Sequence, residues 1–243
     1  MTKAESKVID FIKKHILLFL LVAVTIIAIF LRICGMDFQS DDFNSFLNSW
    51  WSIIKLNDFT GLATQVGNYN IPYQVIIYLM TLLPLNALYA YKIVSIIFDF
   101  VLAISTAMLV YSFAKNNRRL KAILTYSAVL LSATVIFNSS FWAQCDSIYT
   151  SFIILAILFL HKDKPIASFV FIGIAFAFKL QTIFIIPVLL YYWISTKKIS
   201  ILHFFIIPAV DVIMCLPAII MGRPFIDIIT IYAEQTDYGK LIQ

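Results

Sequence analysis

The sequence predicts an all-α integral membrane protein, and three observations carry this prediction. Hydrophobic residues make up 62% of the 243-residue chain and charged residues only 13%, against ~45 to 50% and ~25% in ordinary soluble domains. The mean hydropathy is +0.93, and the apolar residues gather in runs that approach the ~20 residues needed to cross a bilayer. This composition excludes a soluble globular domain and a disordered chain.

The runs define about seven helices of spanning or near-spanning length within one transmembrane module that covers residues 1–243. The first run follows a basic stretch, but it is too long for a signal peptide and no small-residue cleavage site follows it, so we expect a retained anchor. The expected helices are 15–34, 88–113, 120–138, 148–161, 165–178, 181–195 and 199–221.

The segment 71–84 is not counted as a span. It has only ~14 residues between two prolines, Pro72 and Pro84, and this length suits an interfacial helix better than a crossing. We therefore expect residues 35–87 to form one long loop with interfacial helices. The run from Phe43 to Leu56 has apolar residues and two tryptophans at helical spacing, which is typical of an amphipathic helix at the headgroup level.

The distribution of charge predicts the orientation. Short cytoplasmic loops carry excess Lys and Arg, and the N-terminus and the connections near residues 115–121, 162–164 and 197–198 are all basic. The loop 35–87 and the segments 139–147 and 222–243 are acidic on balance. We expect a multi-pass protein of the cell membrane with a cytoplasmic N-terminus. The net charge of +5 reflects this topology, and the absence of a basic patch interleaved with aromatic residues argues against a nucleic-acid partner.

Polar residues that suit catalysis fall on the expected outer face. Asp41 and Asp42 follow the first span and suit either a general base or a divalent-cation site, and the cap of an interfacial helix is the structural alternative, which spacing alone favours. Trp142, Gln144 and Asp146 lie between the third and fourth spans, where an aromatic belt and a helix cap are the structural alternative.

Lys179 lies between two short apolar helices with no acidic residue nearby in the sequence. An ammonium at membrane depth costs ~2.5 to 3.5 kcal/mol on insertion scales, so we expect it to hold a lipid phosphate, with an amide contact from Gln181. A lysine that extends to the headgroups is the alternative. Asp99 and Asp211 are expected to make buried structural contacts, Asp99 with Lys92 or with another helix.

The order and spacing of these residues resemble the polytopic GT-C glycosyltransferases, in particular bacterial relatives of the second mannosyltransferase of the GPI-anchor pathway. The strongest element is Trp142-Ala143-Gln144-Cys145-Asp146-Ser147, followed by Lys179-Leu180-Gln181, similar to a Trp-Gly-Gln-x-Asp-Ser and Lys-x-Gln pair. Asp41-Asp42, Asn68 to Tyr73, and Lys92 to Asp99 match further elements in order, and Tyr232, Gln235 and Tyr238 resemble a later one.

The resemblance implies inverting transfer of a mannose-like or glucose-like hexose from a polyprenyl-phosphate donor to a glycan or lipid-linked acceptor on the outer face. It implies that Asp41, Asp42 and Asp146 are catalytic. It implies that Trp142, Gln144, Lys179, Gln181, Tyr69 and Tyr73 bind substrate. The resemblance does not fix a cofactor; if the enzyme uses a divalent cation such as Mg²⁺ or Mn²⁺, Asp41 and Asp42 are the expected ligands.

Two other functions stay open at this stage. A transporter or flippase of lipid-linked saccharides would bind diphosphate at Lys179 and move substrate without forming a glycosidic bond. Members of the resembled family are usually longer, so a non-catalytic donor-binding module is the other alternative. The adjacent pair Asp41-Asp42 favours the enzyme, because a helix cap needs only one acidic residue.

Overall fold

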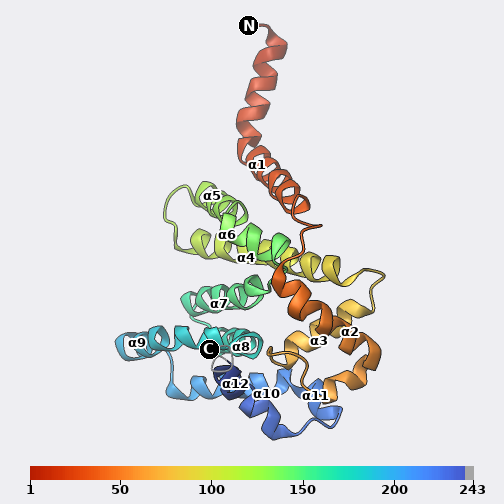
Figure 1. The fold of residues 1–243 in the computed structure, drawn as a ribbon. Helices are drawn as coiled ribbons and strands as arrows, with labels where there is room; N and C mark the ends of the chain where they lie inside the picture. Colours follow the sequence, from red (N-terminus) through yellow and green to blue (C-terminus); the bar gives the residue numbers. More distant parts are fainter. Residues whose placement is uncertain (239–243) are drawn as a thin grey trace.

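The computed structural model of the protein describes residues 1–238, and side chains up to residue 232. This part of the chain folds into helices and their connections, with no strand among the described residues (Figure 1). The α-helices are α1 (Lys3–Ile33), α2 (Asn48–Asn57), α3 (Ile71–Thr81), α4 (Ala87–Phe113), α5 (Arg118–Leu130), α6 (Ala133–Ile136), α7 (Asp146–His161), α8 (Pro165–Phe178), α9 (Ile186–Thr196), α10 (Ile206–Met214), α11 (Leu216–Ile220) and α12 (Phe225–Tyr238).

Short π and 3-10 helices complete the list: η1 (Phe43–Leu47) and η3 (Phe137–Phe141) are π-helices, and η2 (Asp58–Ala63), η4 (Leu180–Ile185) and η5 (Ile201–Phe205) are 3-10 helices. Local sequence sets several of the helix starts. Thr2 and Glu5 form a capping box at the start of α1, and Asn70 and Asn86 cap α3 and α4, because short polar side chains satisfy the first free N–H groups of a helix.

Among the described residues, α1 and α4 are long and apolar enough to cross a membrane. A third crossing is counted if α5 and the helical stretch 133–141 form one span bent by 51°. The other expected spans appear as shorter apolar helices of 10–17 residues. The structure therefore confirms a helical protein with two membrane-length helices.

Four expected helices differ from the structure, and one of them is 181–195, whose first part is the 3-10 helix η4 and whose second part is α9. The first helix begins at Lys3, twelve residues before the expected start at 15, because the capping box extends it through the polar N-terminus. The helix expected at 120–138 is interrupted at Leu131 and Ser132, where Ser132 is extended. The helix expected at 199–221 is divided into η5, α10 and α11. Pro217 at the start of α11 explains the last break, because proline has no N–H to continue a helix.

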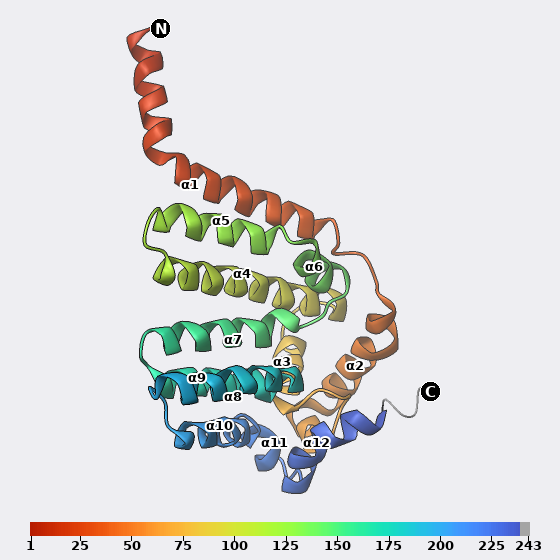
Figure 2. The same ribbon diagram turned by 90° about the vertical axis from the view of Figure 1, so that its left-hand side faces the viewer.

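The helices form a single row of neighbours. Contacts connect α1 to α5, α5 to α4, α4 to α7, α7 to α8 and α8 to α10, and Figure 2 shows the same order from top to bottom. The connections 114–117, 162–164 and 197–200 all lie at one end of this row, whereas α2, α3 and α12 lie at the other (Figure 2). The row thus has a basic end and an end built from the loop 35–87.

Large apolar side chains cover much of the outer surface of the row. Ile26 on α1 is 62% exposed and Tyr191 on α9 is 72% exposed, and the N-terminal half of α1 extends away from the other helices (Figures 1 and 2). Soluble monomers rarely expose apolar surface on this scale. The surface suits a lipid environment.

Candidate functional site

The segment 142–146 connects η3 to α7 and carries three of the expected site residues. Ala143 has a φ of 57°, in the left-handed region that glycine adopts most easily. The segment is held to η3 by hydrogen bonds from the Ala143 N–H to the Ser139 carbonyl, 3.1 Å, and from the Gln144 N–H to the Asn138 carbonyl, 2.8 Å. After this sharp reversal Gln144 contacts the loop 35–87, and Asp146 contacts Lys179 at the end of α8.

A chain of hydrogen bonds joins this segment to the two ends of the loop 35–87. The Gln144 Nε2 donates to Asp42 Oδ2 at 2.7 Å, and the Tyr69 hydroxyl donates to Gln144 Oε1 at 3.2 Å. Asp42 precedes η1, and Tyr69 lies just before α3. Gln144 therefore connects two side chains that are distant in the sequence.

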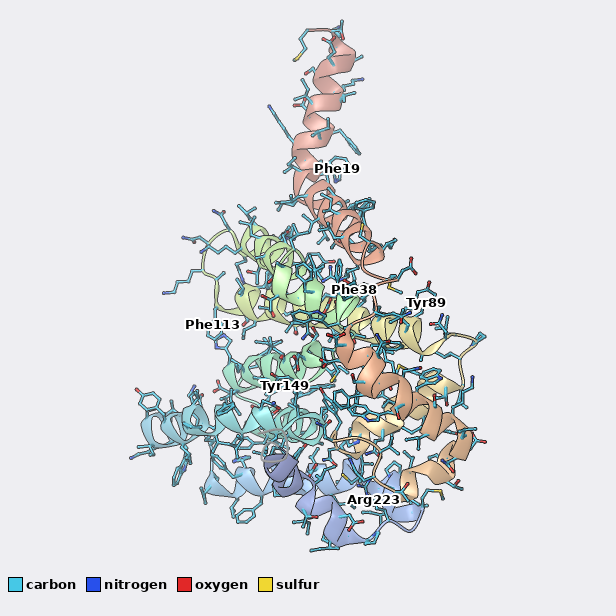
Figure 3. The ribbon with its side chains drawn as sticks, viewed as in Figure 1. Phe19, Phe38, Tyr89, Phe113, Tyr149 and Arg223 are labelled. Carbon is cyan, nitrogen blue, oxygen red and sulfur yellow. The ribbon has the colours of Figure 1, made fainter. Side chains whose placement is uncertain are left out.

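Lys179 and Asp146 form the second half of the site. The Lys179 ammonium makes an ion pair with Asp146 Oδ1, and Asn138 Nδ2 donates to Asp146 Oδ2 at 2.9 Å. Lys179 Nζ also lies 5.7 Å from the ring centroid of Tyr69 and 5.5 Å from that of Tyr149, within the range of a cation–π contact. Tyr149 belongs to α7 (Figure 3).

The electrostatics of the site keep Lys179 charged. Burial lowers the pKa of Lys179, but its hydrogen bond to Asp146 and the charge of Asp146 more than offset this, so the pKa lies above the ordinary 10.5. Burial, together with Cys145 and Asp146, raises the pKa of Tyr69 well above its ordinary value. Tyr69 is therefore a neutral hydrogen-bond donor at physiological pH, and Lys179 is a cation.

Tyr73 is buried and packs against the Tyr69 ring. Its side chain is 3% exposed, and its ring centroid lies 4.8 Å from that of Tyr69. Burial is also the main reason that the pKa of Tyr73 is raised, followed by the charge of Cys145. Trp50 approaches Tyr69 at 5.7 Å between ring centroids. Tyr73 and Trp50, both from the loop 35–87, therefore hold in place the Tyr69 ring that the Lys179 ammonium contacts.

Three of the expected site residues are not part of this cluster. Asp41 and Gln181 are exposed, and within the described chain neither side chain makes a hydrogen bond or ion pair. The Trp142 side chain is 50% exposed and packs against Phe137 at 6.3 Å between ring centroids. Trp142 contributes its carbonyl instead, which accepts a hydrogen bond from Ser40 Oγ at 3.3 Å.

The expected metal pair, Asp41 and Asp42, does not fit a chelating site in this arrangement. Adjacent positions of a helical turn point in different directions, and one carboxylate oxygen of Asp42 already accepts from the Gln144 amide. Among the described residues, no three His, Cys, Asp or Glu side chains gather as metal ligands.

A buried ion pair holds the segment 142–146 in place. Arg32 Nη2 and Nε each lie 2.9 Å from Asp99 Oδ2, and Asp99 also accepts from Ser139 and Ser147, both at 2.5 Å. The two serines flank the segment on either side. The partner of Asp99 is therefore Arg32, on another helix, rather than Lys92, whose ammonium donates to the Gly35 carbonyl at 2.7 Å.

A second polar cluster lies on the other side of Tyr69. Asn70 Nδ2 donates to Asp211 Oδ1 at 3.2 Å and to the Tyr232 hydroxyl at 3.4 Å. Arg223 is 3% exposed, and its Nη1 donates to Gln74 Oε1 at 3.4 Å. Figure 3 shows Arg223 in the lower part of the molecule, among the helices that follow α9. Of the residues named with Tyr232, Gln235 and Tyr238 lie outside the described side chains.

Searches of protein-family models, of curated proteins and of solved structures find no match to this chain. The site must therefore be interpreted from its own geometry. It contains a carboxylate, an amide, a neutral phenol and an ammonium in a continuous arrangement: Asp42, Gln144, Tyr69 and Lys179.

Sequence reasoning missed two members of the site. Tyr149 lies three residues after Asp146 on α7, so helical spacing placed it on the same face, but an aromatic residue in an apolar helix has no distinctive signal. Asn138 precedes the reversal at Ala143, and only the π-helical turn of η3 brings its amide to Asp146.

Proposed function

We propose that this chain is a membrane glycosyltransferase that moves a hexose, mannose-like or glucose-like, from a polyprenyl-phosphate donor to an acceptor with inversion of configuration. The observation that carries the proposal is the separation of a carboxylate, Asp42, from an ammonium, Lys179, by the bridging pair Gln144 and Tyr69. An inverting displacement needs one base on the acceptor side and one stabilising charge at the leaving group. The resemblance to GT-C glycosyltransferases agrees with this assignment.

In this reaction the acceptor hydroxyl oxygen attacks the anomeric carbon of the donor while the bond from that carbon to the phosphate oxygen breaks. Asp42 takes the proton of the acceptor hydroxyl, and the polyprenyl phosphate leaves with the electron pair. Lys179 compensates the negative charge that grows on the phosphate. Its partner Asp146 keeps the ammonium positioned before the donor binds, which favours electrostatic stabilisation without reorganisation.

The structure favours Asp42 over Asp41 as the base. Asp42 is connected to the rest of the cluster through Gln144, whereas Asp41 is exposed without a partner in the described chain. A base must lie within hydrogen-bond reach of the proton that it removes. The Tyr69 ring lies beside Lys179 and is packed from its other side by the buried Tyr73, and it suits the apolar face of a sugar or the first isoprene unit of the donor.

We further propose that the protein spans the cell membrane about seven times with its N-terminus in the cytoplasm. Two helices of membrane length and the basic connections at one end of the row (Figure 2) support this orientation, because short cytoplasmic loops are rich in Lys and Arg. The candidate site would then face outward. A lipid-linked donor and a glycan or lipid-linked acceptor would reach it from the outer leaflet.

The test is hexose transfer by the purified protein in lipid vesicles, with radiolabelled short-chain polyprenyl-phosphate mannose or glucose as donor. Asp42→Asn and Lys179→Ala should each lower the rate at least about 100-fold, since a general base contributes about 10² to 10⁴ and one preorganised group that stabilises developing charge contributes about 10² to 10³. Asp163→Asn and Lys198→Ala are matched controls, because this exposed ion pair lies at the opposite end of the row (Figure 2). Asp41→Asn separates the two adjacent carboxylates.

The alternatives have distinct outcomes in the same vesicles. Movement of the labelled donor between leaflets without formation of a new glycosidic bond would show that the protein is a flippase and not a glycosyltransferase. Saturable donor binding without product would identify a donor-binding module. Equal loss of activity in the control pair would remove the assigned roles of Asp42 and Lys179.

A further inference from the structure

An apolar groove lies between α1, α4 and α5, away from the candidate site. Its volume is about 640 Å³, within the ~300 to 1,000 Å³ of sites that bind small molecules. Its walls are mainly aliphatic and come from all three helices. They include Leu21 of α1, Ile104 and Met108 of α4, and Ala122 and Ile123 of α5.

Three of the hydroxyl groups that line the groove already have partners, and Ser112 Oγ is one of them because it donates to the Leu109 carbonyl at 2.7 Å. The Thr25 hydroxyl lies 3.0 Å from the Tyr126 hydroxyl and donates to the Leu21 carbonyl at 2.8 Å. A polar ligand would find few partners there, because occupied donors and acceptors add little to binding. The interior therefore suits a hydrocarbon chain rather than a sugar.

Two cations lie at one end of the groove. Arg118 and Lys162 both line it, and both are exposed. Arg118 Nε donates to the Tyr111 carbonyl at 2.9 Å and the guanidinium carbon lies 4.2 Å from the Tyr111 ring centroid. Lys162 Nζ lies 5.9 Å from the Phe159 ring centroid. Within the described chain neither residue has a carboxylate partner, so both keep charge available for an anion.

We propose that this groove binds one acyl chain of an anionic phospholipid, with the lipid phosphate held by Arg118 and Lys162. Charge complementarity selects this occupant, because the combination of a hydrocarbon-like interior and two basic residues at its end matches an acidic headgroup attached to a chain. Basic pockets between membrane helices are known to take such headgroups. Arg118 begins α5 and Lys162 directly follows α7, so both belong to the basic end of the row, and the site is separate from the proposed glycosyl transfer.

The test is lipid retention by the whole purified chain, measured by native mass spectrometry during titration with phosphatidylglycerol or phosphatidylcholine. Arg118→Gln with Lys162→Gln should weaken phosphatidylglycerol binding about 30-fold, since each basic residue at a membrane surface contributes roughly fivefold. Arg119→Gln with Lys164→Gln is the matched control. It removes the same charge from neighbouring exposed residues that do not line the groove.

A second variant tests the groove without changing charge. Ala122→Phe fills the aliphatic wall and should also reduce retention of phosphatidylglycerol, so that the proposal stays testable if the double variant fails to fold. The proposal would be overturned by equal retention of phosphatidylcholine, by equal loss in the control pair, or by retention that survives both groove variants. Binding of inorganic phosphate as tight as that of the lipid would overturn it as well, because the acyl chain would then contribute nothing.

Discussion

Two ion pairs of equal length, one buried and one exposed, allow the effect of burial on the stability of this protein to be compared. Arg32 and Asp99 lie 2.9 Å apart with side chains 1% and 0% exposed, whereas Lys198 and Asp163 lie 2.9 Å apart with side chains 57% and 65% exposed. Removing one member of a buried pair leaves an uncompensated charge and costs about 3 to 5 kcal/mol. We expect Arg32→Met and Asp99→Asn each to lower the free energy of unfolding by an amount near the lower limit of this range, about 3 kcal/mol. The polar side chains of a helix that unfolds within a micelle still find other hydrogen-bond partners, which reduces the cost.

The consequence of a loss of about 3 kcal/mol is a fall of more than 100-fold in the ratio of folded to unfolded protein. The assay is unfolding of the detergent-solubilised protein by increasing SDS, followed by circular dichroism and gel filtration. Lys198→Met should leave the unfolding midpoint unchanged within error, because exposed pairs contribute little. The double variant Arg32→Met/Asp99→Asn should cost less than the sum of the two single variants, because it removes both buried charges together.

The same variants connect stability to the site. Asp99 accepts hydrogen bonds from Ser139 and Ser147, which flank the segment that carries Gln144 and Asp146, so Asp99→Asn should also impair donor binding in protein that is still folded. A cost of less than about 1 kcal/mol for either single variant, or strict additivity in the double variant, would refute the reasoning.

Three further predictions concern orientation, charge and backbone geometry. With the native cysteines replaced, Asn44→Cys should react with an impermeant thiol reagent in intact cells and Asn116→Cys should not. Both positions are exposed, but the segments that carry them lie at opposite ends of the row (Figure 2). Labelling of Asn116→Cys alone would show that the orientation is the reverse of the proposed one. Burial lowers the pKa of Lys179, but Asp146 more than offsets this and raises the pKa above its ordinary 10.5. The charge of Lys179 therefore stabilises the fold at pH values below 10.5, and this contribution is lost only as the pH rises through the raised pKa. In thermal unfolding, the difference in stability between wild type and Lys179→Gln should be constant from pH 6 to 9.5, and a difference that falls across that range would contradict the ion pair. Gly67 has a φ of +72°, and a Cβ at this position would lie 2.3 Å from Cε2 of Trp50. Gly67→Ala should therefore destabilise the protein by about 1 to 3 kcal/mol and weaken donor binding, because Trp50 packs against Tyr69. Unchanged unfolding and binding in that variant would show that the loop 64–70 can rearrange freely.

The sequence by itself determined the class of this protein. Its apolar runs predicted helices, and the described residues form helices and their connections, with α1 and α4 long enough to cross a membrane. Local signals such as the capping Asn86 and the prolines at Pro72 and Pro217 act over a few residues, and they are therefore readable from a single chain. The number of spans and the proposed chemistry stay predictions.

Only the tertiary structure decided which polar residues meet. Asp42 and Gln144 are separated by 102 positions, and Lys179 and Asp146 by 33, and no periodicity specifies a contact between such distant residues. Local spacing made Asp41 and Asp42 equivalent, yet packing turned only Asp42 toward Gln144. The partner of Asp99 was likewise hidden in the sequence, because a buried charge is neutralised by whichever cation the neighbouring helix brings within reach, and for Asp99 that helix is α1 with Arg32.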